Sequence, residues 1–295
     1  VASAYLVDNG TCSGVNAPQP LAEILRNGMV ESAHYGHLVI LDATQTRVFS
    51  LGDPAAPIFP RSSIKPIQAR AMVKLGLDIE PRLLALVVAS HSGSVDHISG
   101  VRELLAKFSL DESHLRCAFD LPLGEVERKL WGENPPERIA MNCSGKHAAM
   151  LATCVKNGWP IESYLEQSHP LQVAIKEELE KSAGESISFT STDGCGAPLF
   201  MLSVVGLARA IRAITISVDP IHQSVLDASR KYPEMVAGKG RLTTQMIEAV
   251  PGLYMKDGAE AVEIASMPDG RTLVFKVSDG SLRPFRVLVH AGLKR

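Results

Sequence analysis

A serine and a lysine lie three positions apart in segment 61–66, which reads RSSIKP. Residues three apart on a helix share a face, so the amine of Lys65 could reach the hydroxyl of Ser62. A serine hydroxyl becomes a useful nucleophile when a neighbouring base takes its proton, and a buried lysine with a lowered pKa can be that base. The more ordinary alternative is a helix N-cap followed by a solvated lysine.

Small polar residues also follow a strongly apolar segment. Residues 81–90 carry apolar side chains nearly all round, which is typical of a helix at the centre of a large domain. The residues Ser90, His91 and Ser92 at its end need hydrogen-bond partners if they are buried. They could line a site with their hydroxyls, or they could form a plain helix end capped by Gly93.

Two cysteines lie beside other metal-binding residue types. Cys143 precedes Lys146 and His147 at the predicted start of a helix, and Cys195 lies in a predicted loop over 190–198. Thiolates suit zinc, and His147 is the conventional third ligand because a lysine must lose a proton before it binds a metal. The alternative is that both cysteines only pack in the core. Three further cysteines are expected to be structural: Cys12, Cys117 and Cys154.

The composition is that of an ordinary globular protein, with 45% apolar and 21% charged residues. The formal net charge is −2 and no basic arm is present, so we expect no nucleic-acid partner. No apolar run approaches the ~20 residues of a membrane span. Residues 1–5 show no signal-peptide pattern, and five irregularly spaced cysteines form no disulfide framework, so a cytoplasmic location is expected.

Predicted strands lie towards both ends of the chain and predicted helices lie between them. This order indicates an α+β protein whose sheet is built from both ends, as one domain over 1–295 with a possible helical subdomain at about 78–215. No βαβ alternation or glycine fingerprint for nucleotides is present. The strands are expected over 37–42, 46–50, 261–266 and 272–277, and the main helices over 64–75, 81–90, 95–108, 170–183, 199–213, 220–232, 242–250 and 282–293.

Six short motifs occur in a fixed order and together resemble the rhizobial-type, or class 3, L-asparaginases of the asparaginase II family. The resemblance extends from about Asn9 to the C-terminus. The motifs are RSSIKP at 61–66, ASHS at 89–92, NCSGKH at 142–147, TDGC at 192–195, PEMVAG at 233–238 and KDGA at 256–259.

The resemblance implies a fold similar to serine β-lactamases, penicillin-binding proteins and serine-dependent glutaminases, with helices packed on an antiparallel sheet. It implies hydrolysis of L-asparagine to L-aspartate and ammonia by two Ser–Lys pairs, Ser62 with Lys65 and Ser90 with Lys256. It also implies a homodimer and a zinc ion near the site. The zinc ligands would match Cys143, Lys146 and Cys195, with His147 as the second choice for the third ligand.

The substrate carries an α-carboxylate and an α-ammonium, which need one basic and one acidic anchor. Arg61 and Asp193 are the expected anchors, although Arg61 could equally form a surface ion pair, and His91 is a further expected substrate contact. The sequence departs from the resemblance at Asp257, where the family has an apolar residue after Lys256. Its charge could raise the pKa of Lys256.

Two other functions therefore stay open. One is the same acyl-enzyme chemistry on glutamine or another amide. The other is a zinc-binding protein with an inactive site.

Overall fold

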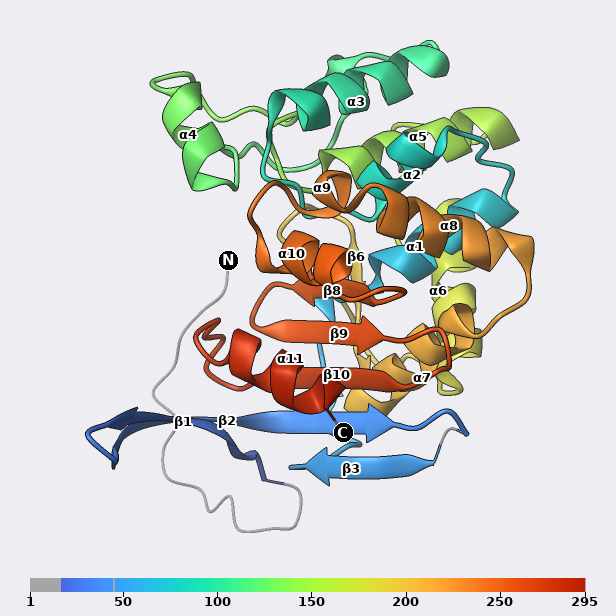
Figure 1. Cartoon of the computed structure of the whole chain (residues 1–295). Coiled ribbons are helices and arrows are strands. Elements are labelled where there is room, and N and C mark those ends of the chain that lie inside the picture. The colour runs from blue at the N-terminus through green and yellow to red at the C-terminus, as the bar shows by residue number, and fades with distance from the viewer. Residues whose placement is uncertain (1–16, 45, 295) are drawn as a thin grey trace.

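The computed structural model of the chain describes residues 17–44 and 46–294 (Figure 1). Two predictions concern residues outside this range, namely the missing signal peptide at 1–5 and the structural role of Cys12. No helix within the described range is long and apolar enough to cross a membrane.

Strands from both ends of the chain form one antiparallel sheet, as the sequence predicts. The order is β1-β2-β10-β9-β8, and β3 also pairs with β2. The first strand and the first half of the second are largely exposed and lack clean apolar alternation, which is why the pattern does not predict them. The strands are β1 (Gln19–Arg26), β2 (Met29–Leu41), β3 (Arg47–Leu51), β8 (Tyr254–Gly258), β9 (Val262–Ser266) and β10 (Thr272–Val277).

Each face of the sheet borders its own hydrophobic core. Val39 and Leu41 of β2 belong to the larger core, and Leu38 and Ile40 belong to the smaller one. This division follows from the strand period of two, which sends successive side chains to opposite faces. The larger core includes α1 (Lys65–Lys74) and α7 (Val204–Thr215), and the smaller one includes α10 (Leu242–Ala249) and α11 (Phe285–Leu293).

The remaining helices lie between the two sets of strands in the sequence, and several of them stand away from the sheet in Figure 1. The subdomain expected at about 78–215 stays a prediction. These helices are α2 (Pro81–Val87), α3 (Val95–Lys107), α4 (Glu125–Trp131), α5 (Ser144–Asn157), α6 (Pro170–Ala183), α8 (Pro220–Lys231) and α9 (Pro233–Val236), with the short 3₁₀ turn η2 (Glu112–His114).

The segment 190–213 differs from its prediction. The expected loop over 190–198 is instead a hairpin, in which β5 (Thr190–Thr192) pairs with β6 (Pro198–Phe200) and only 193–197 is loop. The expected helix over 199–213 begins only at α7. The hydroxyl of Ser203 accepts a hydrogen bond from the Gly206 N–H at 2.8 Å and so caps that helix. A short apolar run cannot be assigned to helix or strand by periodicity alone, and here pairing decides it: β7 (Leu202–Ser203) pairs with β4 (Pro57–Ile58).

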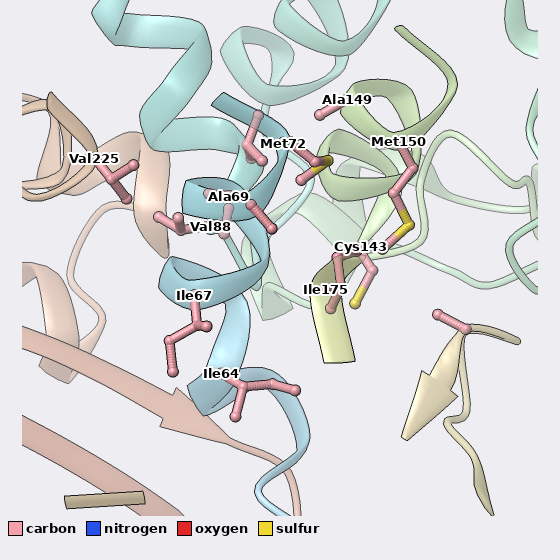
Figure 2. Packing of buried hydrophobic residues seen from close by; sticks show 14 of the residues in the cluster. Ile64, Ile67, Ala69, Met72, Val88, Cys143, Ala149, Met150, Ile175 and Val225 are labelled. Atoms are coloured by element: carbon pink, nitrogen blue, oxygen red, sulfur yellow. The ribbon is translucent and has the colours of Figure 1, made fainter. Parts of the chain in front are cut away.

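Helix α1 runs through the larger core. Its first eight residues are all buried, whereas a surface helix of a globular protein buries one apolar stripe. Figure 2 shows Ile67 and Met72 on this helix among buried side chains of neighbouring segments, including Val88 just after α2 and Met150 of α5. Because this helix is enclosed on all sides, the residues at its start are held in fixed positions.

Candidate active site

The short turn η1 (Arg61–Ile64) leads directly into α1 and carries Ser62. Ser62 is not an N-cap, because neither helix start has a side-chain cap. Within the described residues its hydroxyl forms no hydrogen bond, so the expected direct bond with Lys65 is not made. Arg61 has a φ of 54°, a left-handed conformation that costs a residue with a side chain about 1 kcal/mol or more.

The hydroxyl of Ser90 lies between two lysine amines. The Nζ of Lys256 donates to the Ser90 Oγ at 2.9 Å, and the Nζ of Lys65 lies 3.3 Å from the same oxygen. Lys65 also donates to the carbonyl of Ala89. Both lysines are almost completely buried, which is rare for this residue type unless it has partners. The structure therefore brings the expected Ser90–Lys256 pair together and adds Lys65 to it.

Backbone hydrogen bonds join three of the motifs around Ser90. The Ser90 N–H donates to the Val236 carbonyl at 3.1 Å, and the His91 N–H donates to the Asn142 carbonyl at 3.1 Å. The Ser92 N–H donates to the Ala237 carbonyl at 2.8 Å. Helix α2 ends at Val87, so this buried segment is a connection whose N–H groups bond to other motifs, rather than a plain helix end.

Two glycines of the motifs allow this close packing. A Cβ on Gly238 would lie 1.8 Å from the hydroxyl oxygen of Ser92, and the φ of this residue is 137°. A Cβ on Gly258 would lie 2.5 Å from the carbonyl oxygen of Pro60, just before η1. Any side chain at either position would push the motifs apart, so glycine is needed there.

Asp257 and Arg241 extend the contacts of Lys256. Asp257 accepts from Lys256 through its carboxylate at 2.8 Å and its carbonyl at 2.6 Å, and Arg241 donates to the same carboxylate at 3.0 Å. Burial lowers the pKa of Lys256, and this effect outweighs Asp257, which raises it. Asp257 therefore raises the pKa of Lys256, as the sequence suggests, but the net shift of this pKa is downward. Arg241 was not among the sequence candidates; its only signal is its place after the glycine-rich segment 233–240.

The two expected substrate anchors contact each other. The Arg61 Nε lies 2.7 Å from a carboxylate oxygen of Asp193. Burial raises the pKa of Asp193, but the charges of Lys146 and Arg61 outweigh burial and hold the pKa below its usual value. Arg61 is therefore not a plain surface residue: its pairing joins the first motif to the fourth.

His91 follows Ser90 directly in the chain, and its side chain is completely buried. Its Nε2 lies 2.8 Å from the hydroxyl of Ser144, and its ring stacks on His97 with centroids 5.1 Å apart. Because the Ser144 hydroxyl donates to the Ile139 carbonyl, the Nε2 of His91 must be the donor in that bond. A contact between His91 and a substrate stays a prediction.

The expected metal ligands lie together. The Nζ of Lys146 lies 3.2 Å from the Sγ of Cys195, and the thiol of Cys143 lies close enough to influence the pKa of Cys195. The neighbouring Cys143 thiol and the charge of Lys146 lower the pKa of Cys195 to about 5, although burial opposes the shift. Cys143 is the N-cap residue of α5, whose first residue is Ser144, although the side chain of Cys143 forms no capping hydrogen bond.

The donor set fits a zinc ion only if Lys146 takes part. No group of three histidine, cysteine, aspartate or glutamate side chains in the described range could hold a metal ion. His147 hydrogen-bonds through its Nδ1 to the Tyr164 hydroxyl at 2.7 Å. Two free thiols and one amine therefore form the candidate donor set, which is soft enough for zinc.

A comparison with family models matches residues 22–295 to L-asparaginase II. The chain belongs to the L-asparaginase II family. It is thus a member of a hydrolase family, as the six motifs predict. A search among curated proteins finds no match.

Solved structures similar to this L-asparaginase II family member are distant. A β-lactamase from Mycobacterium bovis is 17% identical, with 88% of this chain and 94% of that chain covered and a TM-score of 0.46. A putative β-lactamase from Bacteroides dorei is 12% identical, with coverages of 88% and 93% and a TM-score of 0.48. A Bacillus glutaminase is 12% identical, with coverages of 88% and 90% and a TM-score of 0.41. At these TM-scores the likenesses carry no argument about chemistry.

Proposed function

We propose that this L-asparaginase II family member hydrolyses L-asparagine to L-aspartate and ammonia by a serine nucleophile that a lysine activates. Family membership supports the reaction class. The observation that carries the mechanism is the Ser90 hydroxyl held between the amines of Lys256 and Lys65. Two neighbouring amines disfavour each other's charged form, so one of them can act as a base.

In the proposed first half-reaction, the Ser62 oxygen attacks the side-chain amide carbon of asparagine. The Ser62 proton passes to Lys65, which is the first residue of the adjoining helix. The carbon–nitrogen bond then breaks, and the leaving ammonia takes a proton that Lys256 passes on through the Ser90 hydroxyl. The product of this half is ammonia and an aspartyl ester on Ser62.

The second half-reaction reverses the roles. Water attacks the ester carbon and gives one proton to Lys256, which the first half-reaction left neutral. L-aspartate is released as the ester bond to Ser62 breaks. The Ser62 oxygen recovers a proton from Lys65, so the enzyme returns to its first state. The oxyanion needs N–H donors near the helix start; the Ser63 N–H is already bonded to the Pro60 carbonyl at 3.2 Å, which leaves that of Ser62 as the candidate.

Arg61 and Asp193 are proposed to bind the α-carboxylate and the α-ammonium of the substrate. Their mutual ion pair supports this role, because it places opposite charges side by side, as the two substituents of an amino acid require. Each has some exposed surface, so a ligand can reach both groups.

Cys143, Lys146 and Cys195 are proposed to hold zinc. When bound, the ion would add a fixed positive charge near Asp193 and tie segment 142–147 to segment 190–198. Homodimer formation and a cytoplasmic location also stay proposals.

The test measures ammonia released from L-asparagine and from L-glutamine by the purified chain, with and without added zinc. We expect release from asparagine, and a faster rate than with glutamine, because a site built for one chain length rejects another. Ser62→Ala should abolish turnover, and mass spectrometry of the wild type should find the ester on Ser62. An ester on Ser90, which both lysines contact, would instead make Ser90 the nucleophile.

A further inference from the structure

The contacts of Asp257 and Arg241 with the Ser90–Lys256 pair form a closed ring of hydrogen bonds. Lys256 joins the Ser90 hydroxyl to the Asp257 carboxylate, at 2.9 Å and 2.8 Å. Arg241 joins the same carboxylate to the Ser90 carbonyl, at 3.0 Å and 2.9 Å. The ring thus links the hydroxyl and the carbonyl of Ser90 to the two carboxylate oxygens of Asp257, through the Lys256 amine and the Arg241 guanidinium.

The acceptors in this ring determine how the Lys256 amine is turned. Asp257 offers it two acceptors, the carbonyl at 2.6 Å and the carboxylate at 2.8 Å, and neither of them can donate. Both must therefore take an N–H of Lys256. The remaining position on the nitrogen, an N–H in the ammonium and a lone pair in the neutral amine, faces the Ser90 hydroxyl.

We propose that Asp257 and Arg241 are positioning residues of the reaction: Asp257 turns the exchangeable position of the Lys256 amine towards Ser90, and Arg241 holds Asp257 in place. This inference rests on the proposed function of the Ser–Lys pairs. Neither residue touches the substrate in this scheme, so they act through Lys256.

The charges around Lys256 give the two residues opposite effects. Burial lowers the pKa of Lys256; Asp257 raises it, and Lys65 and Arg241 lower it further. On the neighbouring strand β9, burial raises the pKa of Glu263 well above its usual value, so its uncharged form is favoured. Among the charged groups on the elements packed against β8, Arg61 of η1 pairs with Asp193, and Arg230 of α8 pairs with Asp227.

The Arg241–Asp257 pair also borders the surface. Both residues line a cavity of about 370 Å³, together with Arg283 and Arg286. Substitutions that keep the side-chain shape are therefore expected to leave the fold intact, since one side of the pair already faces open space.

The experiment compares Asp257→Asn with Arg241→Gln in the full chain, through the pH dependence of kcat/KM for ammonia release. Protonated Lys256 is the active form in the step that releases ammonia in this scheme, so its pKa sets the alkaline limb of the profile. Removing the negative charge at Asp257 lowers the pKa of Lys256, so the alkaline limb of the profile should move to lower pH. Removing the positive charge at Arg241 should move the limb to higher pH, and Arg241→Lys, which keeps the charge, should leave it in place. Both neutralised variants should lose roughly tenfold or more in kcat.

Asp269→Asn is the matched control. Asp269 has the same residue type and also pairs with an arginine, Arg271, at 2.8 Å, but it lies in the turn between β9 and β10. Its variant should keep both kcat and the limb.

A nitrogen NMR titration of the Lys256 amine, identified by its absence in Lys256→Arg, separates this inference from the proposed function. If no ammonia is released from asparagine, the proposed function fails, and the titration alone decides the inference. Opposite shifts in the two neutralised variants support it. The inference is overturned if the limb of the kcat/KM profile and the Lys256 titration do not move, or move in the same direction in both variants, even if kcat falls. If Asp257→Asn does not fold, the contrast between Arg241→Gln and Arg241→Lys decides.

Discussion

The amine of Lys256 lies 2.9 Å from the hydroxyl of Ser90, although 166 positions separate the two residues in the sequence. Lys65 approaches the same hydroxyl from α1 at 3.3 Å. One hydroxyl thus connects the first, second and last motifs. This arrangement supports proton exchange between two lysines through Ser90, in line with the proposed relay.

Replacing Lys256 by methionine removes the amine and keeps an unbranched side chain. We expect kcat for ammonia release to fall roughly 10²- to 10⁴-fold, since a positioned acid–base group contributes about that much. Lys181→Met, at an exposed position on α6, is the control and should keep full activity. A Lys256→Met enzyme that keeps the wild-type kcat would rule out the relay.

Replacing Asp193 by asparagine tests the substrate anchor. A hydrogen bond to a charged group contributes about 1.5–3 kcal/mol, so KM for asparagine should rise roughly ten- to a hundredfold. Asp227→Asn, whose carboxylate lies 3.4 Å from Arg230 on α8, is the matched control. Steady-state kinetics measures both, and an unchanged KM in Asp193→Asn contradicts the assignment.

Replacing Cys195 by serine tests the zinc site without an activity assay. Elemental analysis of the purified wild type should find about one zinc per chain, and Cys195→Ser should retain little of it, because a hydroxyl is a poor zinc ligand. Cys154→Ser is the control, since Cys154 is also a buried free cysteine but lies further along α5. Equal zinc in all three proteins, or none in the wild type, would argue against the site.

The buried His91 predicts that acid destabilises the fold. Burial lowers its pKa well below the usual value, and the charges of His97, Lys65 and Arg241 add to this effect. The unfolded chain takes up a proton on this histidine below about pH 6.5, and the native chain does not. The free energy of unfolding should therefore fall as pH decreases through that window, by about 1.4 kcal/mol per pH unit for this one group.

His91→Gln keeps a nitrogen donor for Ser144 and cannot titrate, so its free energy of unfolding should depend less steeply on pH. Urea unfolding from about pH 5 to about pH 7.5 measures the slopes. His290→Gln, at an exposed position on α11, should leave the slope as it is in the wild type. Equal slopes for His91→Gln and the wild type would be the contrary result.

Local sequence signals predict several elements well. Helix α6 and strand β10 have the predicted bounds, 170–183 and 272–277. The helix begins at a proline and ends at Gly184 in a left-handed conformation, and the strand is a compact apolar run. Over 199–203 the apolar pattern fits a helix or a strand equally well. Pairing with another strand decides the conformation there, and the local sequence pattern does not predict that pairing.

The sequence by itself determined the residue types of the site, the order of the six motifs and the membership of the L-asparaginase II family. Only the tertiary structure decided which partners these residues meet. The spacing pairs Lys65 with Ser62, but the folded chain turns this lysine to the Ala89 carbonyl and to Ser90, because a buried amine needs acceptors. The link between Arg241 and Asp257 and the lowered pKa of Lys256 likewise depend on burial and on contacts between distant segments, which spacing along the chain does not contain.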